Sequence, residues 1–134
     1  MTPEQAAQRP PITLIESEAD TLADLAFGIR ARHPNVSRLL LEEIDRADTL
    51  SAEDMPGDVV TMGSTVEFAV QKTGERRTVK LVYPKDADIA EGRLSILTPV
   101  GAGLIGLRIG QSISWPDRNG EERLLTIENV TQPD

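Results

Sequence analysis

The sequence predicts an α+β protein in which an antiparallel helical hairpin precedes a small antiparallel sheet with one short helix. Apolar residues recur every three or four positions up to about residue 48, as they do along one face of a helix. Beyond Met55-Pro56-Gly57 they alternate with polar residues, as they do in a strand that is buried on one face. We therefore expect the hairpin within residues 1–52 and the sheet domain within residues 53–134.

The hairpin segment contains two apolar stripes. Ser17 is a candidate N-cap residue for the first helix, and Pro34 suits the first turn of the second. Because the connection between the helices is short, they should lie antiparallel as a short coiled coil, preceded by a frayed segment over residues 1–11. The stripe residues are Leu22, Leu25, Ala26 and Ile29 in the first helix and Val36, Leu40, Ile44 and Ala47 in the second. The acidic residues of the second helix, including Glu43, are expected on its solvent-exposed face.

The second half of the chain predicts two β-hairpins. Thr73-Gly74 and Asn119-Gly120 supply their turns, because glycine and asparagine tolerate the positive φ angles of tight turns. Between the hairpins, residues 101–107 have room for only two helical turns, so one short helix is expected against the sheet. The alternating apolar residues are Val66, Phe68 and Val70, then Val79, Leu81 and Tyr83, and finally Ile113, Trp115, Leu125 and Ile127.

Composition excludes several classes of function. The chain has 22 acidic and 14 basic side chains and a formal net charge of −8, whereas binding to a nucleic-acid backbone needs clustered cations, so we expect no direct nucleic-acid contact. The absence of cysteine excludes a disulfide, a thiolate nucleophile and a cysteine-based metal site. Because the sequence has no signal peptide and no apolar run long enough to cross a bilayer, we expect no membrane partner and a cytoplasmic location.

Two motifs suggest chemistry that their context does not support. Gly101, Gly103 and Gly106 form a G-x-G-x-x-G pattern, but Gly110 ends the segment before a helix could cross back over a parallel sheet, so we interpret these glycines as sites of close backbone packing. The acidic residues of the segment 86–91 lack the spacing of a calcium loop. We therefore predict no cofactor, no metal site and no catalytic residue.

Two stretches together resemble a known family. Residues 59–66 read VVTMGSTV, and residues 94–101 read LSILTPVG. They are similar to the C-terminal domain of the Gre transcript-cleavage factors, which has an FKBP-like fold. The linker narrows the resemblance, because residues 43–47, EIDRA, and residues 55–62, MPGDVVTM, resemble the Rnk family, whose members are named as regulators of nucleoside diphosphate kinase.

The resemblance implies a partner and a docking surface. Gre factors bind bacterial RNA polymerase, with the FKBP-like domain at the rim of the secondary channel and the helical hairpin directed inward. The docking surface that the resemblance implies consists of Thr98, Pro99, Val100, Gly101 and Leu104. Thr98, Pro99 and Val100 open the short segment that leads into the predicted helix.

The hairpin tip departs from the Gre pattern. In Gre factors the hairpin is long, and acidic residues at its tip hold a magnesium ion in the polymerase active site. The tip here, residues 31–35, offers Arg32, His33 and Asn35 and contains no carboxylate. The first helix is expected to have about sixteen residues, which gives it a reach of roughly 24 Å.

These features predict a non-catalytic transcription regulator. It should bind core RNA polymerase near the secondary channel, compete with Gre-type factors and not stimulate transcript cleavage. The alternative is an FKBP-like peptidyl-prolyl isomerase, for which Phe68, Tyr83 and Trp115 are few aromatic residues to line a pocket. A link to nucleoside diphosphate kinase rests on the family name alone, and both a direct contact and an indirect effect through transcription remain open.

Overall fold

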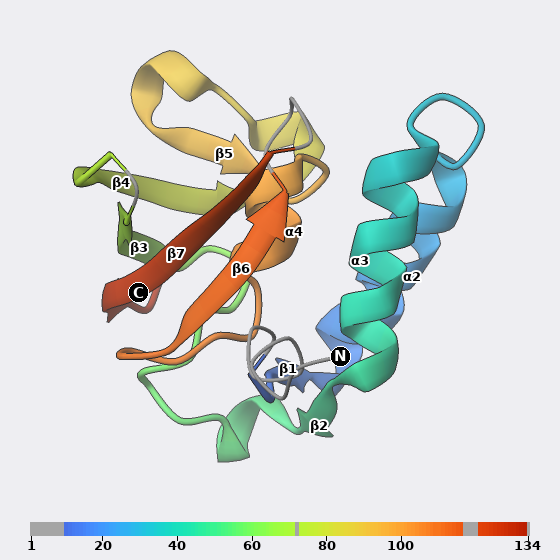
Figure 1. The fold of residues 1–134 in the computed structure, drawn as a ribbon. Coiled ribbons are helices and arrows are strands. Elements are labelled where there is room, and N and C mark those ends of the chain that lie inside the picture. Colours follow the sequence, from blue (N-terminus) through green and yellow to red (C-terminus); the bar gives the residue numbers. More distant parts are fainter. Residues whose placement is uncertain (1–9, 72, 117–120, 134) are drawn as a thin grey trace, which may run out of the picture.

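The computed structural model describes residues 10–71, 73–116 and 121–133. A helical hairpin stands on one side of a curved sheet, and a short helix, α4, lies between them (Figure 1). The predicted α+β class, with the helical hairpin N-terminal to the sheet, is confirmed. The expected Asn119-Gly120 turn lies outside the described residues, as do residues 1–9 of the segment that was expected to be frayed.

The two hairpin helices are α2 (Glu16–Gly28) and α3 (Pro34–Arg46). Each has 13 residues, which gives a length of roughly 20 Å, so the first helix is shorter than expected. Pro34 occupies the first turn of α3, as predicted. The prediction of Ser17 as the N-cap residue is wrong, because the N-cap position lies two residues earlier, at an extended Ile15 that makes no side-chain cap, and α2 begins at Glu16.

The apolar interior of the hairpin is rotated relative to the predicted stripe. Leu39 and Leu40 are fully buried in α3, whereas Val36 and Ile44 are only partly buried. The rotation follows from a second neighbour, since α3 packs against α4 as well as against α2. A buried hydrogen bond of 2.8 Å from the Ser37 hydroxyl to the carbonyl oxygen of Ala26 joins the two helices.

Glu43 lies in the interior and not on the expected charged face. Its exposed fraction is 0%, and both carboxylate oxygens accept hydrogen bonds from Arg46, at 2.9 Å from Nε and 2.6 Å from Nη2. A third guanidinium nitrogen of Arg46 donates to the carbonyl oxygen of Pro10. Because a buried carboxylate is costly unless it is paired, this planar arrangement both neutralises Glu43 and ties α3 to the chain that enters the first strand.

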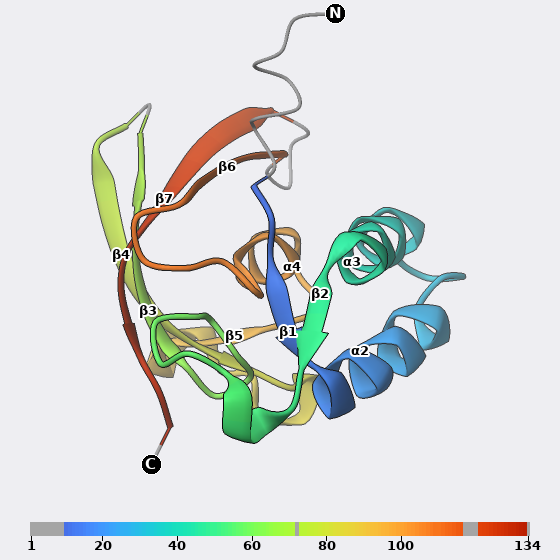
Figure 2. The same cartoon turned by 90° about the horizontal axis from the view of Figure 1, so that it is seen from below.

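A two-stranded parallel ladder closes the base of the hairpin. The strands β1 (Thr13–Ile15) and β2 (Asp48–Leu50) flank the two helices and pair with each other, which the sequence did not indicate (Figure 2). β1 is also attached to the sheet domain, because the Thr13 amide donates to the carbonyl oxygen of Gly106 at 3.2 Å. Gly106 has a φ of +84°, and a Cβ there would meet the Ile12 side chain at 2.9 Å, so only glycine suits this junction.

The main sheet has the strand order β5-β4-β3-β7-β6. Its strands are β3 (Thr65–Val70), β4 (Glu75–Val82), β5 (Arg93–Ser95), β6 (Ser112–Pro116) and β7 (Glu122–Thr131). The pairs are antiparallel as predicted, with the exception of the edge pair β4–β5, which is parallel. The expectation of a fully antiparallel sheet is therefore wrong at this edge, because the two 3₁₀ turns Pro84–Asp86 and Ile89–Glu91 carry the chain back to the start of β5.

The short helix α4 (Pro99–Leu104) packs directly on Trp115 of β6. A Cβ on Gly103 would lie 2.8 Å from the indole ring, and the indole N–H donates to the carbonyl oxygen of Pro99. The glycines of the G-x-G-x-x-G pattern thus allow close packing, as we interpreted them. Residues from both sides of the expected boundary near residue 52 share one hydrophobic core. Its largest fully buried side chains include Trp115, Phe68, Ile12, Leu14, Leu22, Leu39 and Leu40.

Replacing Gly103 tests this packing. We expect Gly103→Ala to lower the free energy of unfolding, because overpacking costs about 1–3 kcal/mol while the gain in helix propensity is about 1 kcal/mol. Gly28→Ala is the matched control, since a Cβ on this last residue of α2 meets nothing within 4 Å. Denaturant unfolding of both variants measures the difference. A Gly103→Ala protein as stable as the control would mean that the indole can move aside.

Candidate functional site

The segment that opens α4 is held in one conformation by its own hydrogen bonds. The hydroxyl of Thr98 donates to the carbonyl oxygen of Ser95 at 2.7 Å and accepts from the Gly101 amide at 3.1 Å. Thr98 is therefore a side-chain N-cap, and Pro99 occupies the first helical position, where a missing N–H costs nothing. Together with the bond from Trp115 to Pro99, these contacts make the segment a preformed surface.

The structure divides the expected docking residues into two groups. Thr98, Pro99 and Val100 are partly exposed. Gly101 is buried, since a Cβ there would lie 2.4 Å from the carbonyl oxygen of Ser95, and Leu104 has an exposed fraction of 0%. Leu104 lies on the face of α4 that points into the core. A partner can therefore reach residues 98–100 of this fold, but not Leu104.

A groove of about 720 Å³ runs beside this exposed segment. Ile89, with an exposed fraction of 62%, and Leu94 give the groove an apolar wall, while Arg77 and Arg93 supply cations. We call it the α4 groove, and it is lined by Arg77, Ala87, Asp88, Ile89, Arg93, Leu94, Ser95, Thr98, Pro99 and Val100. The sequence analysis did not identify the apolar wall formed by Ile89 and Leu94. The available signal was Ile89, a large apolar residue within an otherwise polar stretch.

The hairpin tip is exposed and lies apart from α4 and β5 (Figure 1), and none of its residues lines the α4 groove. The backbone amides of Arg32 and His33 both donate to the carbonyl oxygen of Ile29, at 3.0 and 2.7 Å. His33 precedes α3 without capping it through its side chain, and the Asn35 side chain accepts a hydrogen bond from Arg38. The tip thus presents the three side chains that the sequence places there, to solvent and not to the groove.

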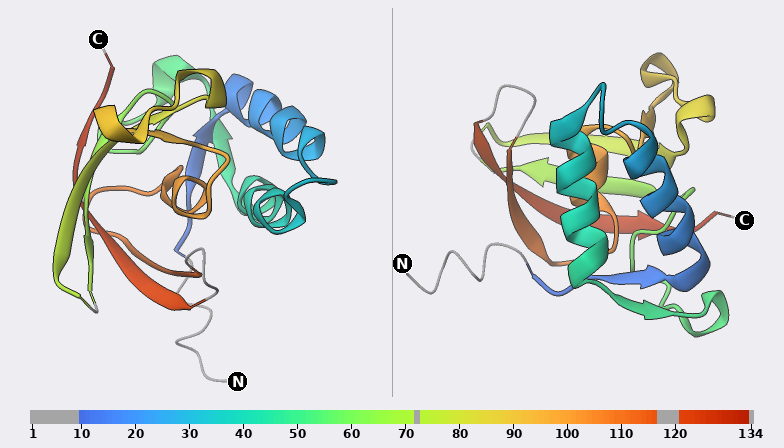
Figure 3. Two further views of the ribbon diagram at one scale, coloured as in Figure 1. Left: turned by 90° about the horizontal axis from the view of Figure 1, so that it is seen from above. Right: turned by 90° about the vertical axis from the view of Figure 1, so that its right-hand side faces the viewer.

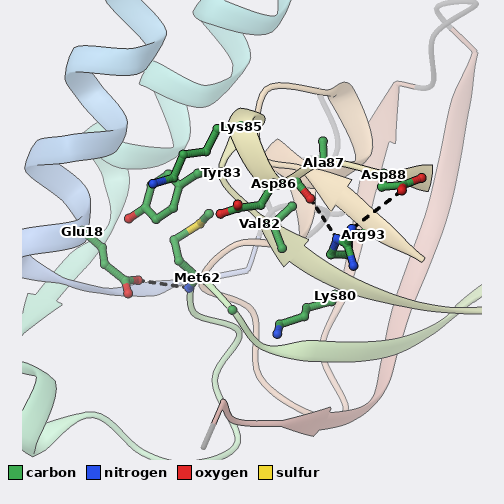
Figure 4. A pocket seen from close by; sticks show the side chains of 11 residues that line it. Glu18, Met62, Lys80, Val82, Tyr83, Lys85, Asp86, Ala87, Asp88 and Arg93 are labelled. Carbon is green, nitrogen blue, oxygen red and sulfur yellow. Dashed lines mark hydrogen bonds and ion pairs between the residues drawn. The ribbon is translucent and has the colours of Figure 1, made fainter. Parts of the chain in front are cut away.

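A second cavity of about 630 Å³ lies between α2 and the edge of the sheet (Figure 4). Glu18 enters it from α2, and its carboxylate accepts a hydrogen bond of 3.1 Å from the Met62 amide. Burial raises the pKa of Glu18, and the Met62 hydrogen bond opposes this shift. The pKa of Tyr83 is raised by burial first and then by the negative charge of Glu18. The two groups therefore belong to one electrostatic environment.

The described residues offer no constellation for a metal. No group of three histidine, aspartate or glutamate side chains comes together among them. In the segment that superficially resembles a calcium loop, Asp88 is paired with Arg93 at 3.7 Å, and Arg93 also donates to the carbonyl oxygen of Asp86. A small hollow of about 210 Å³ next to Trp115 and Phe68 falls below the usual volume of a ligand pocket, about 300–1,000 Å³.

Comparison with known proteins gives the family. Residues 55–132 match the family described as transcription elongation factor GreA/GreB, C-terminal domain. The chain therefore belongs to the GreA/GreB-type family. Within it, the chain is 40% identical to "Regulator of nucleoside diphosphate kinase" from Escherichia coli K12, over 94% of this chain and 93% of that protein.

Two further relatives agree with this assignment. The transcription elongation factor GreA of Methylobacterium nodulans is 32% identical, over 81% of this chain and 74% of its own length. The solved structure titled "Prokaryotic transcription elongation factor GreA/GreB from Nitrosomonas europaea" is 37% identical, with a TM-score of 0.70, and the match covers 91% of this chain and 98% of that one. In the ranges that the structure describes, no helix is both long enough and apolar enough to span a membrane.

The coupling between Glu18 and Tyr83 can be measured directly. Tyr83 is the single tyrosine of the chain, so the absorbance of tyrosinate reports its titration. We expect Glu18→Gln to lower the pKa of Tyr83, because removing a nearby negative charge makes the phenolate less unfavourable. The pKa should stay above its ordinary value, since burial remains. Glu16→Gln, an exposed position in the same helical turn, should leave the titration unchanged. Identical curves for all three proteins would contradict the coupling.

Proposed function

We propose that this protein is a non-catalytic transcription regulator that binds core RNA polymerase near the secondary channel and competes there with Gre-type factors. The main support is that the exposed part of the Gre-like segment, residues 98–100, lines a preformed groove. Membership of the GreA/GreB-type family supports RNA polymerase as the partner. The apolar wall at Ile89 suits a protein surface, because side chains that anchor interfaces fill grooves of this kind.

The hairpin supports regulation without transcript cleavage. Its tip presents Arg32, His33 and Asn35 in place of carboxylates, and each helix is only roughly 20 Å long. Cleavage that depends on a tip-held magnesium ion needs both oxygen ligands and sufficient reach. We propose that the protein occupies the polymerase in the cytoplasm without supplying either. An effect on nucleoside diphosphate kinase, which the name of the Escherichia coli relative suggests, would then act indirectly through transcription.

The alternative of a peptidyl-prolyl isomerase has less support. An isomerase needs an open apolar cleft, but the hollow at Trp115 has a volume of only about 210 Å³. Trp115 and Phe68 each have an exposed fraction of 1% and serve the core. The relatives reported above are named as a regulator or as elongation factors.

Docking through the α4 groove is tested by a charge placed on its wall. We expect Pro99→Ala combined with Val100→Asp to weaken binding to purified core polymerase by roughly tenfold or more, because the new carboxylate must lose its hydration at an apolar contact. The carbonyl oxygen that accepts from Trp115 is backbone and is retained. A pull-down with labelled protein measures the loss, and excess Gre factor should displace the wild type. Simultaneous occupancy by both proteins would exclude a shared site.

The control for this variant is Ile109→Asp. Ile109 is a large apolar residue with an exposed fraction of 42% that does not line the α4 groove. The Ile109→Asp protein should bind polymerase as tightly as the wild type does. Circular dichroism separates lost contact from lost fold, and equal weakening by both variants would argue against the groove.

The absence of cleavage is tested at the tip. The wild type should give no cleavage products with a stalled elongation complex. The double variant Arg32→Asp with Asn35→Glu supplies carboxylates but leaves the helices at 13 residues each, so it should remain inactive. Transcript analysis on a sequencing gel measures this, with a Gre factor as the positive control. A product ladder with the double variant alone would show that reach is not limiting, and a ladder with the wild type would refute the non-cleaving function.

A further inference from the structure

The hairpin carries an apolar groove that the α4 site does not use. The groove has a volume of about 640 Å³, and the residues that line it come only from α2, α3 and the connection between them. Phe27 lies in it with an exposed fraction of 52%, beside the partly buried Leu41 and Ile44. On the side of the hairpin that faces away from the sheet, no other described element covers the two helices (Figure 3, right). An aromatic residue this exposed on a groove marks a surface suited to burial against a partner.

The charges along this groove are sorted by position. Arg30 and Arg38 lie near the hairpin tip, whereas Glu42 and Asp45 lie toward its base. Arg38 and Asp45 are about two helical turns apart, roughly 10 Å along α3, and both line the groove together with Leu41, which lies between them in sequence. Arg38 also forms an ion pair of 3.2 Å with Glu42 of the same helix. Beside this pair, Arg30 leaves the tip end of the groove positive and Asp45 leaves the base end negative, with the apolar residues between them.

We propose that this surface is the interface of a homodimer in which two hairpins pack antiparallel across a two-fold axis near Leu41. In a two-fold dimer the same patch meets itself, so a patch must be self-complementary. An antiparallel arrangement places the positive end of each groove opposite the negative end of the other, with Arg38 facing Asp45 of the second copy. It also buries Phe27 of both copies. Formation of this dimer requires no other protein and does not depend on polymerase binding.

The expected dimer is weak. Two short hairpins bury an area at the low end of specific interfaces, below about 1,200 Å². Sedimentation analysis over a concentration series up to the solubility limit should therefore show a monomer–dimer equilibrium. Phe27→Gln, which keeps a helix-compatible side chain, should raise the dissociation constant roughly tenfold. Ile109→Gln, at an exposed apolar position outside the groove, should leave it unchanged.

Charge reversal tests the antiparallel arrangement itself. Arg38→Glu alone places like charges at both ends of the dimer, and so does Asp45→Arg alone, so each variant should be monomeric. In an equimolar mixture the two variants can form a heterodimer. At one end of it the introduced glutamate faces the introduced arginine, and at the other end the native Asp45 faces the native Arg38. The mixture should therefore form a heterodimer of wild-type stability. Its formation also shows that both variants are folded, although each changes a residue of α3.

Several outcomes would overturn the proposal. A wild-type chain that stays monomeric throughout the series excludes the homodimer. If the wild type is monomeric and the Phe27→Gln variant no longer binds polymerase, the groove contacts a helix of the polymerase and not a second copy of the chain. A dimer that is unaffected by Phe27→Gln uses another surface. A mixture of the charge variants that remains monomeric, while circular dichroism shows both to be helical, excludes the antiparallel pairing.

Discussion

The contact between the Trp115 indole and the backbone of Gly103 determines where α4 lies. The ring leaves no room for a Cβ on that residue, and its N–H donates to the carbonyl oxygen of Pro99. The Trp115 side chain thus fixes both the middle of α4, through the contact with Gly103, and the exposed turn at its start, through the hydrogen bond to Pro99. Because α3 packs on the opposite side of α4, the position of the hairpin also depends on this contact. A surface formed this way needs little reorganisation before it meets a partner, which lowers the entropic cost of binding.

Periodicity predicted the long elements, and it failed where structure depends on contacts between distant residues. The two helices and the two β-hairpins follow from repeats of apolar residues over their own length. The strands β1 and β2 have three residues each, too few for an alternation to be recognised. Glu43 was expected outside because an acidic residue on a helix is normally solvated, and its link through Arg46 to the Pro10 carbonyl oxygen is invisible in local sequence.

The candidate site was likewise predicted from the sequence only where it depends on local residues. The segment at residues 98–101 was recognised from its motif, and its turn and glycines have the structural roles that such a motif suggests. Which of its residues are accessible required the fold, since Leu104 lies on the inward face of a helix only 6 residues long. The wall opposite comes from Ile89, on a 3₁₀ turn that precedes the parallel edge strand. A parallel pairing at an otherwise antiparallel edge cannot be read from alternation, because both pairings have the same period.

The order of the strands has a consequence for synthesis on the ribosome. β7 lies inside the sheet, paired with β3 on one side and β6 on the other, yet it follows every other described strand in the chain. Thr65 at the start of β3 pairs with Thr131 and Val70 at its end pairs with Leu125, so one edge of β3 has no hydrogen-bonding partner until β7 has emerged. The α2–α3 hairpin forms from local contacts and can fold early. A nascent chain thus holds a folded arm beside an open sheet, and this interval is when it most needs protection from aggregation.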